Sequence, residues 1–493
     1  MSVLSILYWL SRIIAIGAII HVVLDNRQPA KTMAWALVIY FLPLFGVVAY
    51  IFFGVNRRKE RFISRRSMDM LKKRSMLEFV EQRHTELPEA YETSIRLFAE
   101  QSSSLPFLNR KTDILTSGYE FFPRLLRDIA AARSHIHIDI YIIEDDALGR
   151  LVADALIAKA RQGVEVRLIY DDVGCWKVKN RFFERMREEG IDAEPFMPVH
   201  FPQFTSKANY RNHRKIIVID GTIGYVGGMN IAMRYVHTPN KLGRRRGLIK
   251  RKKQCSDPQP PNLGGSWRDT MLRIEGGGVN GLQQAFLVDW YFVDRTLLSD
   301  RKYYTKPEAE GALMQMATSG PVATYPEIMQ GYLRIIMAAK RYVYFETPYF
   351  LPPDAVFLAM KTAAASGVDV RILVPRSSDA FFVEWASRSY LREAAEASIS
   401  IGLYEGAFLH SKIMVSDDAV CTCGSTNLDF RSFENNFEGN AFFYDADVAC
   451  RMRDVFLVDE QQSVPLSSVH GRINPSLPQR MWDSLTRLFS PLL

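Results

Sequence analysis

The strongest constraint on this chain is a motif, His-x-Lys-x-x-x-x-Asp, that occurs once in each half. The first copy begins at His213 and the second at His410. In both copies β-forming residues follow the lysine, so the motif predicts a strand, on which residues two apart point to the same face. His213 and Lys215 therefore point one way together, and so do His410 and Lys412. Each half must fold so that it presents one imidazole and one ammonium group.

Each motif continues into a predicted hairpin. The aspartate, Asp220 or Asp417, closes the strand at a turn, and a second apolar run follows. That run ends at Gly227-Gly228-Met229-Asn230 in the first copy and at Gly424-Ser425-Thr426-Asn427 in the second. A single His-x-Lys pair on a strand is usually an ordinary exposed edge. Two copies with the same trailing glycine and asparagine instead predict a site to which each half contributes.

The order of predicted elements repeats as well. The first half is predicted to have a helix at 125–132, a strand at 136–142, a helix at 148–161 and a strand at 164–169; the second half repeats this order at 332–340, 342–347, 355–365 and 368–373. Alternating strands and helices are typical of an α/β layer fold. The sequence thus predicts a tandem duplication, with one domain at 107–305 and another at 306–493.

Two long apolar runs stand at the N-terminus. Residues 3–24 and 33–55 are each long enough to cross a bilayer, and the short connection between them predicts a transmembrane hairpin over residues 1–55. The first run has no basic segment before it, which argues against a cleaved signal peptide. Basic residues from Arg57 onward place the rest of the chain on the cytoplasmic side of the membrane.

The formal net charge of +8 favours an anionic partner, either nucleic acid or an acidic membrane surface. Basic residues cluster in a juxtamembrane linker, 56–106, and in an insertion, 235–265, whose run 241–253 has no counterpart in the second half. Beside a membrane hairpin, contact with lipid headgroups is favoured over a nucleic-acid arm or a solvated loop. The five cysteines have no metal-ligand spacing and are expected to be reduced thiols.

Two imidazoles that face each other across a domain interface suit displacement at phosphorus. One histidine, neutral, would attack and become a covalent phosphohistidine; the other would protonate the leaving oxygen and then deprotonate the incoming alcohol. Lysine and asparagine side chains would surround the non-bridging oxygens, so neither a metal nor another cofactor is expected. These residues are Lys215, Lys412, Asn230 and Asn427.

Carboxylates are expected to complete the site. A carboxylate on the far nitrogen of each imidazole would fix its tautomer, and a candidate lies downstream of each motif: Asp269 after the first and Glu438 after the second. The motif acids Asp220 and Asp417 sit at turns, away from the lysines, and are expected to be local structural acids rather than proton carriers.

The paired motifs with their trailing Gly-Gly/Ser-x-Asn resemble the phospholipase D superfamily. More narrowly, the chain is similar to bacterial cardiolipin synthases from the N-terminal hairpin through Thr347-Pro348-Tyr349-Phe350 and Asn427-Leu428-Asp429-Phe430 to its close. This resemblance implies two tandem phospholipase D-like domains with mixed sheets flanked by helices. It also implies transphosphatidylation of two phosphatidylglycerols into cardiolipin and glycerol, at a bacterial inner membrane.

The resemblance also implies residue roles. His213 would be the nucleophile and His410 the acid, the Lys and Asp of both motifs would count among the catalytic residues, and Ser425 would contact phosphate. Gly228 departs from the family's usual serine. The implied partners are the membrane and the anionic lipids phosphatidylglycerol and cardiolipin, not nucleic acid; the oligomeric state, including a homo-oligomer, stays open.

Three other functions use some of the same features. A hydrolytic phospholipase D needs the same residues and differs in whether water or a lipid hydroxyl resolves the intermediate; the hairpin favours a lipid acceptor. A nuclease of the superfamily would exploit the positive charge, but two membrane spans argue against it. A lipid-binding scaffold without activity would be expected to have lost a motif histidine or lysine, and all four are present.

Overall fold

The computed structural model describes residues 3–25, 29–54, 89–101, 104–199, 210–236 and 267–490, except 307, 309, 322, 324 and 470. Most of the basic linker predicted at 56–106, and the basic run 241–253, lie outside the described residues.

Fifteen strands within the described residues form one mixed sheet. The strands of the first half are β1 (Pro106–Leu115), β2 (His135–Ile140), β3 (Glu165–Asp171), β4 (Asp192–Phe196), β5 (Lys215–Ile219), β6 (Ile223–Gly227) and β7 (Met271–Gly276). Those of the second half are β8 (Ala312–Ser319), β9 (Tyr342–Glu346), β11 (Asp369–Pro375), β12 (Ser400–Tyr404), β13 (Ile413–Ser416), β14 (Val420–Gly424), β16 (Glu438–Phe443) and β17 (Ser463–Pro465). A separate pair joins β10 (Phe350–Leu351) to β15 (Leu428–Asp429).

The strand order makes the duplication visible. From the outer edge inward, the first half runs β4-β3-β2-β5-β6-β7-β1 and the second runs β12-β11-β9-β13-β14-β16-β8, with β17 added outside β12. The central strands β1 and β8 pair antiparallel, with Phe107 opposite Met314. The predicted tandem duplication is therefore confirmed, and one continuous sheet joins its two halves.

The repeated local sequences form the same elements in both halves. The predicted strands at 164–169 and 368–373 are β3 and β11, and each follows a helix, α7 (Ala147–Ala160) or α11 (Asp354–Ala365). Gly163 and Gly367 stand between helix and strand with φ of 86° and 90°. Glycine adopts this left-handed conformation without a Cβ clash, so it ends both helices at the same point.

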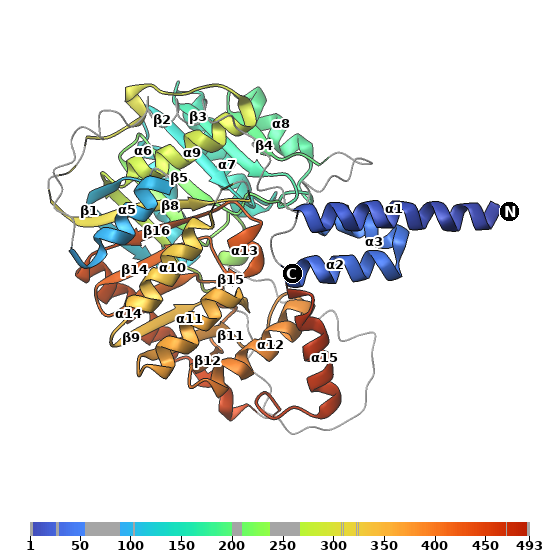
Figure 1. Cartoon of the computed structure of the whole chain (residues 1–493). Coiled ribbons are helices and arrows are strands. Elements are labelled where there is room, and N and C mark those ends of the chain that lie inside the picture. The colour runs from blue at the N-terminus through green and yellow to red at the C-terminus, as the bar shows by residue number, and fades with distance from the viewer. Residues whose placement is uncertain are drawn as a thin grey trace, which may run out of the picture.

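Helices cover both faces of the sheet (Figure 1). The helices on one face are α5 (Glu92–Gln101), α6 (Gly118–Ala131), α7, α8 (Asn180–Glu188), α10 (Glu327–Ala338), α11 and α12 (Phe381–Glu396). The other face carries α9 (Val279–Asp294) and α14 (Ala446–Glu460), whose apolar side chains pack in a core shared by strands of both halves. The short α13 (Phe430–Glu434) and the C-terminal α15 (Leu477–Arg487) complete the body.

The N-terminal apolar runs fold into helices that project from this body (Figure 1). The first is α1 (Val3–Asp25); the second is divided into α2 (Pro29–Phe41), α3 (Pro43–Ala49) and a π-helical turn (Tyr50–Gly54). The division falls at Pro43, which lacks the N–H that a continuous helix requires. Ala15, Val22, Ile39 and Tyr50 pack together, and the Arg12 guanidinium donates to the Tyr40 carbonyl (2.7 Å). Among the described residues, no helix combines the length and the apolar content of a membrane span.

Candidate active site

Each motif histidine is held by the other half of the chain. His213 lies just before β5, and its N–H donates to the carbonyl of Phe437 (2.9 Å), just before β16. His410 lies just before β13, and its N–H donates to the carbonyl of Arg268 (2.7 Å), just before β7. These exchanged backbone bridges place both motifs at the interface between the halves.

The predicted carboxylates contact the motif histidines, but each one contacts the histidine of the opposite half of the chain. Both Glu438 carboxylate oxygens are 3.1 Å from His213 Nδ1, and Asp269 Oδ2 is 2.6 Å from His410 Nδ1. The sequence interpretation placed each carboxylate with the motif upstream of it. That pairing is wrong because the segments that enter β7 and β16 run beside the motif of the opposite half.

The two lysines are buried next to their histidines. Lys215 Nζ donates to the His213 carbonyl (2.6 Å), and Lys412 Nζ donates to the His410 carbonyl and lies 2.9 Å from His410 Nδ1. Both ammonium groups are nearly inaccessible to solvent. The centre of the Tyr141 ring lies 5.1 Å from the ammonium of Lys215 and 4.9 Å from the centre of the His213 ring.

Burial and charge shift every ionisable group here. Burial lowers the pKa of His213, and burial together with the Lys412 charge lowers the pKa of His410 to about 3. Burial likewise lowers the pKa of Lys412, and that of Lys215 to about 7. Burial acts to raise the pKa of Asp269 and Glu438, but the facing histidine and lysine charges outweigh it and hold both below their usual value. Burial thus favours the neutral form of both imidazoles, and the cationic groups beside Asp269 and Glu438 favour the charged form of both carboxylates.

The two asparagines differ in their partners. Asn230 Oδ1 accepts the Ile142 N–H (3.1 Å), and its Nδ2 donates to the Tyr235 hydroxyl (3.0 Å). Asn427 is also buried, but among the described residues its Oδ1 has no hydrogen-bond partner. A buried oxygen without a hydrogen-bond partner destabilises the fold unless a ligand or solvent donates to it.

Ser425 and Gly228, which follow the two hairpins, each lie against a carboxylate that contacts a motif histidine. The Ser425 hydroxyl donates to Glu438 and accepts the Gly439 N–H (3.0 Å), and the residue is fully buried. It therefore orients a carboxylate, whereas the family resemblance gives it a phosphate contact. A Cβ at Gly228 would overlap Asp269 Oδ1. The departure from serine at this position thus leaves room for the carboxylate that holds His410.

The motif aspartates lie at the far ends of the strands, away from the histidines. Asp220 accepts the backbone N–H groups of residues 133–135, and Asp417 accepts those of residues 340–342. Each carboxylate thus ties its hairpin to the start of the neighbouring strand, β2 or β9. This geometry agrees with the interpretation of both as local structural acids.

Sequence reasoning missed a buried carboxylate behind each motif. Asp139 on β2 pairs in register with Ile216, and Glu346 on β9 pairs with Ile413, so the two acids occupy equivalent positions beside the residue that follows each lysine. Burial and the nearby Asp459 raise the pKa of Glu346 to about 8, which keeps this acid largely protonated at neutral pH. Acids in strand sequences carried no signal because an acidic residue on a strand usually faces solvent.

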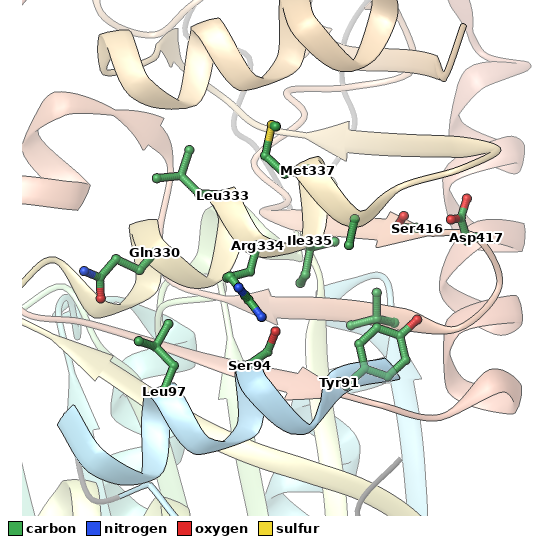
Figure 2. A pocket seen from close by; sticks show the side chains of 12 residues that line it. Tyr91, Ser94, Leu97, Gln330, Leu333, Arg334, Ile335, Met337, Ser416 and Asp417 are labelled. Atoms are coloured by element: carbon green, nitrogen blue, oxygen red, sulfur yellow. The ribbon is translucent and has the colours of Figure 1, made fainter. Parts of the chain in front are cut away.

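A cavity of about 600 Å³ lies elsewhere, between α5, α10 and the start of the β13–β14 turn (Figure 2). Its lining includes Leu97, Leu333, Met337 and Asp417. Asp417 closes the end of β13 opposite to His410, so this cavity is separate from the histidine pair.

The duplicated sheet and the exchanged histidine–carboxylate pairs define a two-domain phospholipase D-like protein. The family model described as "Cardiolipin synthase, PLD-like domain" matches residues 125–241 and 332–459, and a phospholipase D-nuclease N-terminal model matches residues 13–54. The chain belongs to the cardiolipin synthase family.

Individual relatives cover nearly the whole chain. The cardiolipin synthase of Oceanobacillus iheyensis is 35% identical over 504 residues and covers 100% of both chains. That of a Geobacillus species is 37% identical over 481 residues, which is 95% of this chain and 90% of the relative. A solved structure, phosphatidylserine synthase from Haemophilus influenzae, has a TM-score of 0.58 at 14% identity, and the match covers 82% of this chain and 100% of that chain. At that identity the structural match supports the fold alone.

Proposed function

We propose that the protein synthesises cardiolipin by transferring a phosphatidyl group from one phosphatidylglycerol to another, with release of glycerol. The observation that carries this proposal is the pair of buried imidazoles, each bonded through Nδ1 to a carboxylate of the opposite half. That hydrogen bond keeps the proton on Nδ1 and directs the lone pair of Nε2 outward, as a nucleophile or base requires.

The first step forms a covalent intermediate. His213 Nε2 attacks phosphorus, the bond from phosphorus to the glycerol oxygen breaks, and His410 gives a proton to that oxygen. The pKa of His410 is low in the free enzyme, so it must gain this proton as substrate binds. The negative phosphodiester, held beside it, raises the pKa of the imidazole and favours its protonated form.

The second step resolves the intermediate. His410, now neutral, takes the proton from the hydroxyl of a second phosphatidylglycerol, whose oxygen attacks phosphorus as the bond to His213 breaks. The negative phosphodiester also raises the pKa of Lys215 and Lys412 and favours their charged forms beside the reacting group. The unpartnered Oδ1 of Asn427 can accept a hydrogen bond from a lipid hydroxyl. Assignment of the nucleophile to His213 follows the family resemblance.

We propose that residues 1–55 form a membrane hairpin that keeps this site at the inner membrane, with the catalytic domains on the cytoplasmic side. Support comes from α1, which exposes large apolar side chains over most of its length; these include Trp9, Ile13, Ile16 and Ile20. The anionic lipids of that membrane would be both substrates and partners. We place the two domains at 107–305 and 306–493, divided in the connection from α9 to β8.

Product analysis tests the function. The purified full chain, reconstituted with phosphatidylglycerol, should yield cardiolipin and glycerol by mass spectrometry. Phosphatidic acid as the only lipid product would make the protein a hydrolase and contradict the proposal. A His213→Ala variant supplies the blank for contaminating activity.

A further inference from the structure

The C-terminal helix α15 presents its apolar side chains outward. Leu477, Met481 and Leu485 of α15, and its C-cap Leu488, are spaced three or four residues apart, a spacing that places them along one side of the helix. All four are exposed, with Leu477 at 71% and Leu488 at 74%. A surface helix in a soluble protein normally buries this face.

Polar contacts hold the opposite face of α15 on the body. Asp483 is fully buried and accepts from Arg392 of α12 (2.6 Å), and Arg487 pairs with Glu393 (2.8 Å) and lies over the Tyr390 ring. The helix is therefore fixed to α12, with its orientation set by one buried ion pair, Arg392–Asp483, and one partly exposed pair, Arg487–Glu393. These contacts keep the apolar face of α15 turned outward.

Aromatic side chains at the start of α12 extend this surface beyond α15. Phe381 and Phe382 are exposed, and the Trp385 ring lies 6.1 Å from that of Trp482 on α15. Asp379, two residues before Phe381, accepts from the Tyr349 hydroxyl (2.7 Å) and acts electrostatically on Lys412. The patch thus begins at the loop between β11 and α12 and continues onto α15.

The first half has an aromatic residue at the equivalent place. Trp176 follows β3 as Phe381 follows β11, and it is exposed beside Lys177 and Lys179. Its neighbour Cys175 contacts the carbonyl of Tyr141, whose ring packs on His213. Exposed aromatic groups therefore follow the equivalent strands β3 and β11 in the two halves, and basic residues accompany Trp176.

We propose that α15, the start of α12 and the loop that contains Trp176 (residues 172–179) form a docking surface. This surface inserts into the headgroup region of an anionic lipid bilayer. Outward apolar side chains with adjacent cations are what such an interface binds. The N-terminal helices α1–α3 project from the body on the same side of the view as α15 (Figure 1), so one bilayer can engage both. The orientation of the docking surface rests on the membrane hairpin of the proposed function, and the turnover assay rests on the proposed reaction.

Depth-dependent quenching tests the docking independently of turnover. Met481→Cys is labelled with an environment-sensitive fluorophore in the full chain reconstituted in vesicles of phosphatidylcholine and phosphatidylglycerol, with Cys255→Ser and Cys450→Ser in the background. Met337→Cys is the matched control, because Met337 is 61% exposed but borders the cavity at the far end of β13. Lipids brominated in their acyl chains should quench the label at 481 and not the label at 337. Equal quenching at both positions, or unquenched Met481→Cys that crosslinks to a second copy, would overturn the proposal.

Turnover gives the second readout. Leu485→Ser combined with Leu488→Ser should slow cardiolipin formation from phosphatidylglycerol in vesicles by at least about ten-fold, because each removes apolar surface from the bilayer contact. The same variant should turn over monomeric short-chain phosphatidylglycerol at the unmodified rate, and Met337→Ser should change neither assay. Unchanged turnover in vesicles would contradict the docking surface. An unmodified protein that converts neither form of the lipid would refute the proposed function, while the quenching result would stand.

Discussion

At the scale of single residues, the two histidines occupy related but unequal environments. His213 shares both oxygens of Glu438, whereas His410 has one short contact to Asp269 and a lysine against the same ring nitrogen. The difference extends to the supporting residues, Ser425 in one copy and Gly228 in the other. The duplication has thus kept the positions of the groups while changing the contacts that orient them.

Exchange of these two small residues tests that asymmetry. Gly228→Ser should lower turnover by about 10- to 100-fold, because its side chain displaces the carboxylate that orients His410. Ser425→Gly should cost less, roughly ten-fold, since it removes one hydrogen bond from Glu438. Steady-state rates of both variants check the prediction. A Gly228→Ser enzyme as active as the unmodified protein would contradict the role of the glycine.

Glu346 gives a prediction about pH. Its pKa is raised by burial from about 4.5 to about 8, so the folded protein holds a proton that the unfolded chain releases. Stability from this group is complete below pH 4.5 and is lost as the pH rises to about 8. Glu346→Gln keeps the neutral form, so its Tm relative to the unmodified protein should increase across this range and level off above it. A Tm difference that does not change with pH would contradict the protonated state.

At the scale of elements, the hairpins depend on their closing acids. Asp220 accepts three backbone N–H groups that belong to β2 or the turn before it. Asp220→Ala should therefore lower the free energy of unfolding by about 2 kcal/mol, as expected for the loss of hydrogen bonds to a charged acceptor. The rate per folded molecule should stay near that of the unmodified protein. Thermal unfolding and active-site titration separate the two effects, and a lost rate with unchanged stability would make Asp220 a catalytic group instead.

Most elements could be predicted from the sequence because their local patterns repeat. The segments from Gly163 and from Gly367 carry the same glycine, alternation and register, and both form the predicted strand. The pairing of Glu438 with His213 could not be predicted, because it depends on which segments meet across the sheet. The outward face of α15 was equally hidden, since an apolar stripe alone predicts burial against the core.

At the scale of the whole molecule, the halves share one sheet and one site. The β1–β8 pair continues the sheet, and α9 and α14 pack in one core with strands of both halves. We therefore expect the catalytic body to unfold as one cooperative unit, although it contains two phospholipase D-like domains. Calorimetry of the reconstituted protein should show a single transition for this body. Two separate transitions would indicate domains that fold independently.

The central claim is that the two histidines of this shared site have different tasks, and trapping the intermediate tests it most directly. A phosphatidyl ester of nitrophenol needs no acid to release its leaving group, so His410→Asn should still give a burst of about one nitrophenolate per site. Peptide mass spectrometry should then locate the phosphatidyl group on His213, and His213→Asn should give no burst. A burst from His213→Asn, or an adduct on His410, would contradict the account.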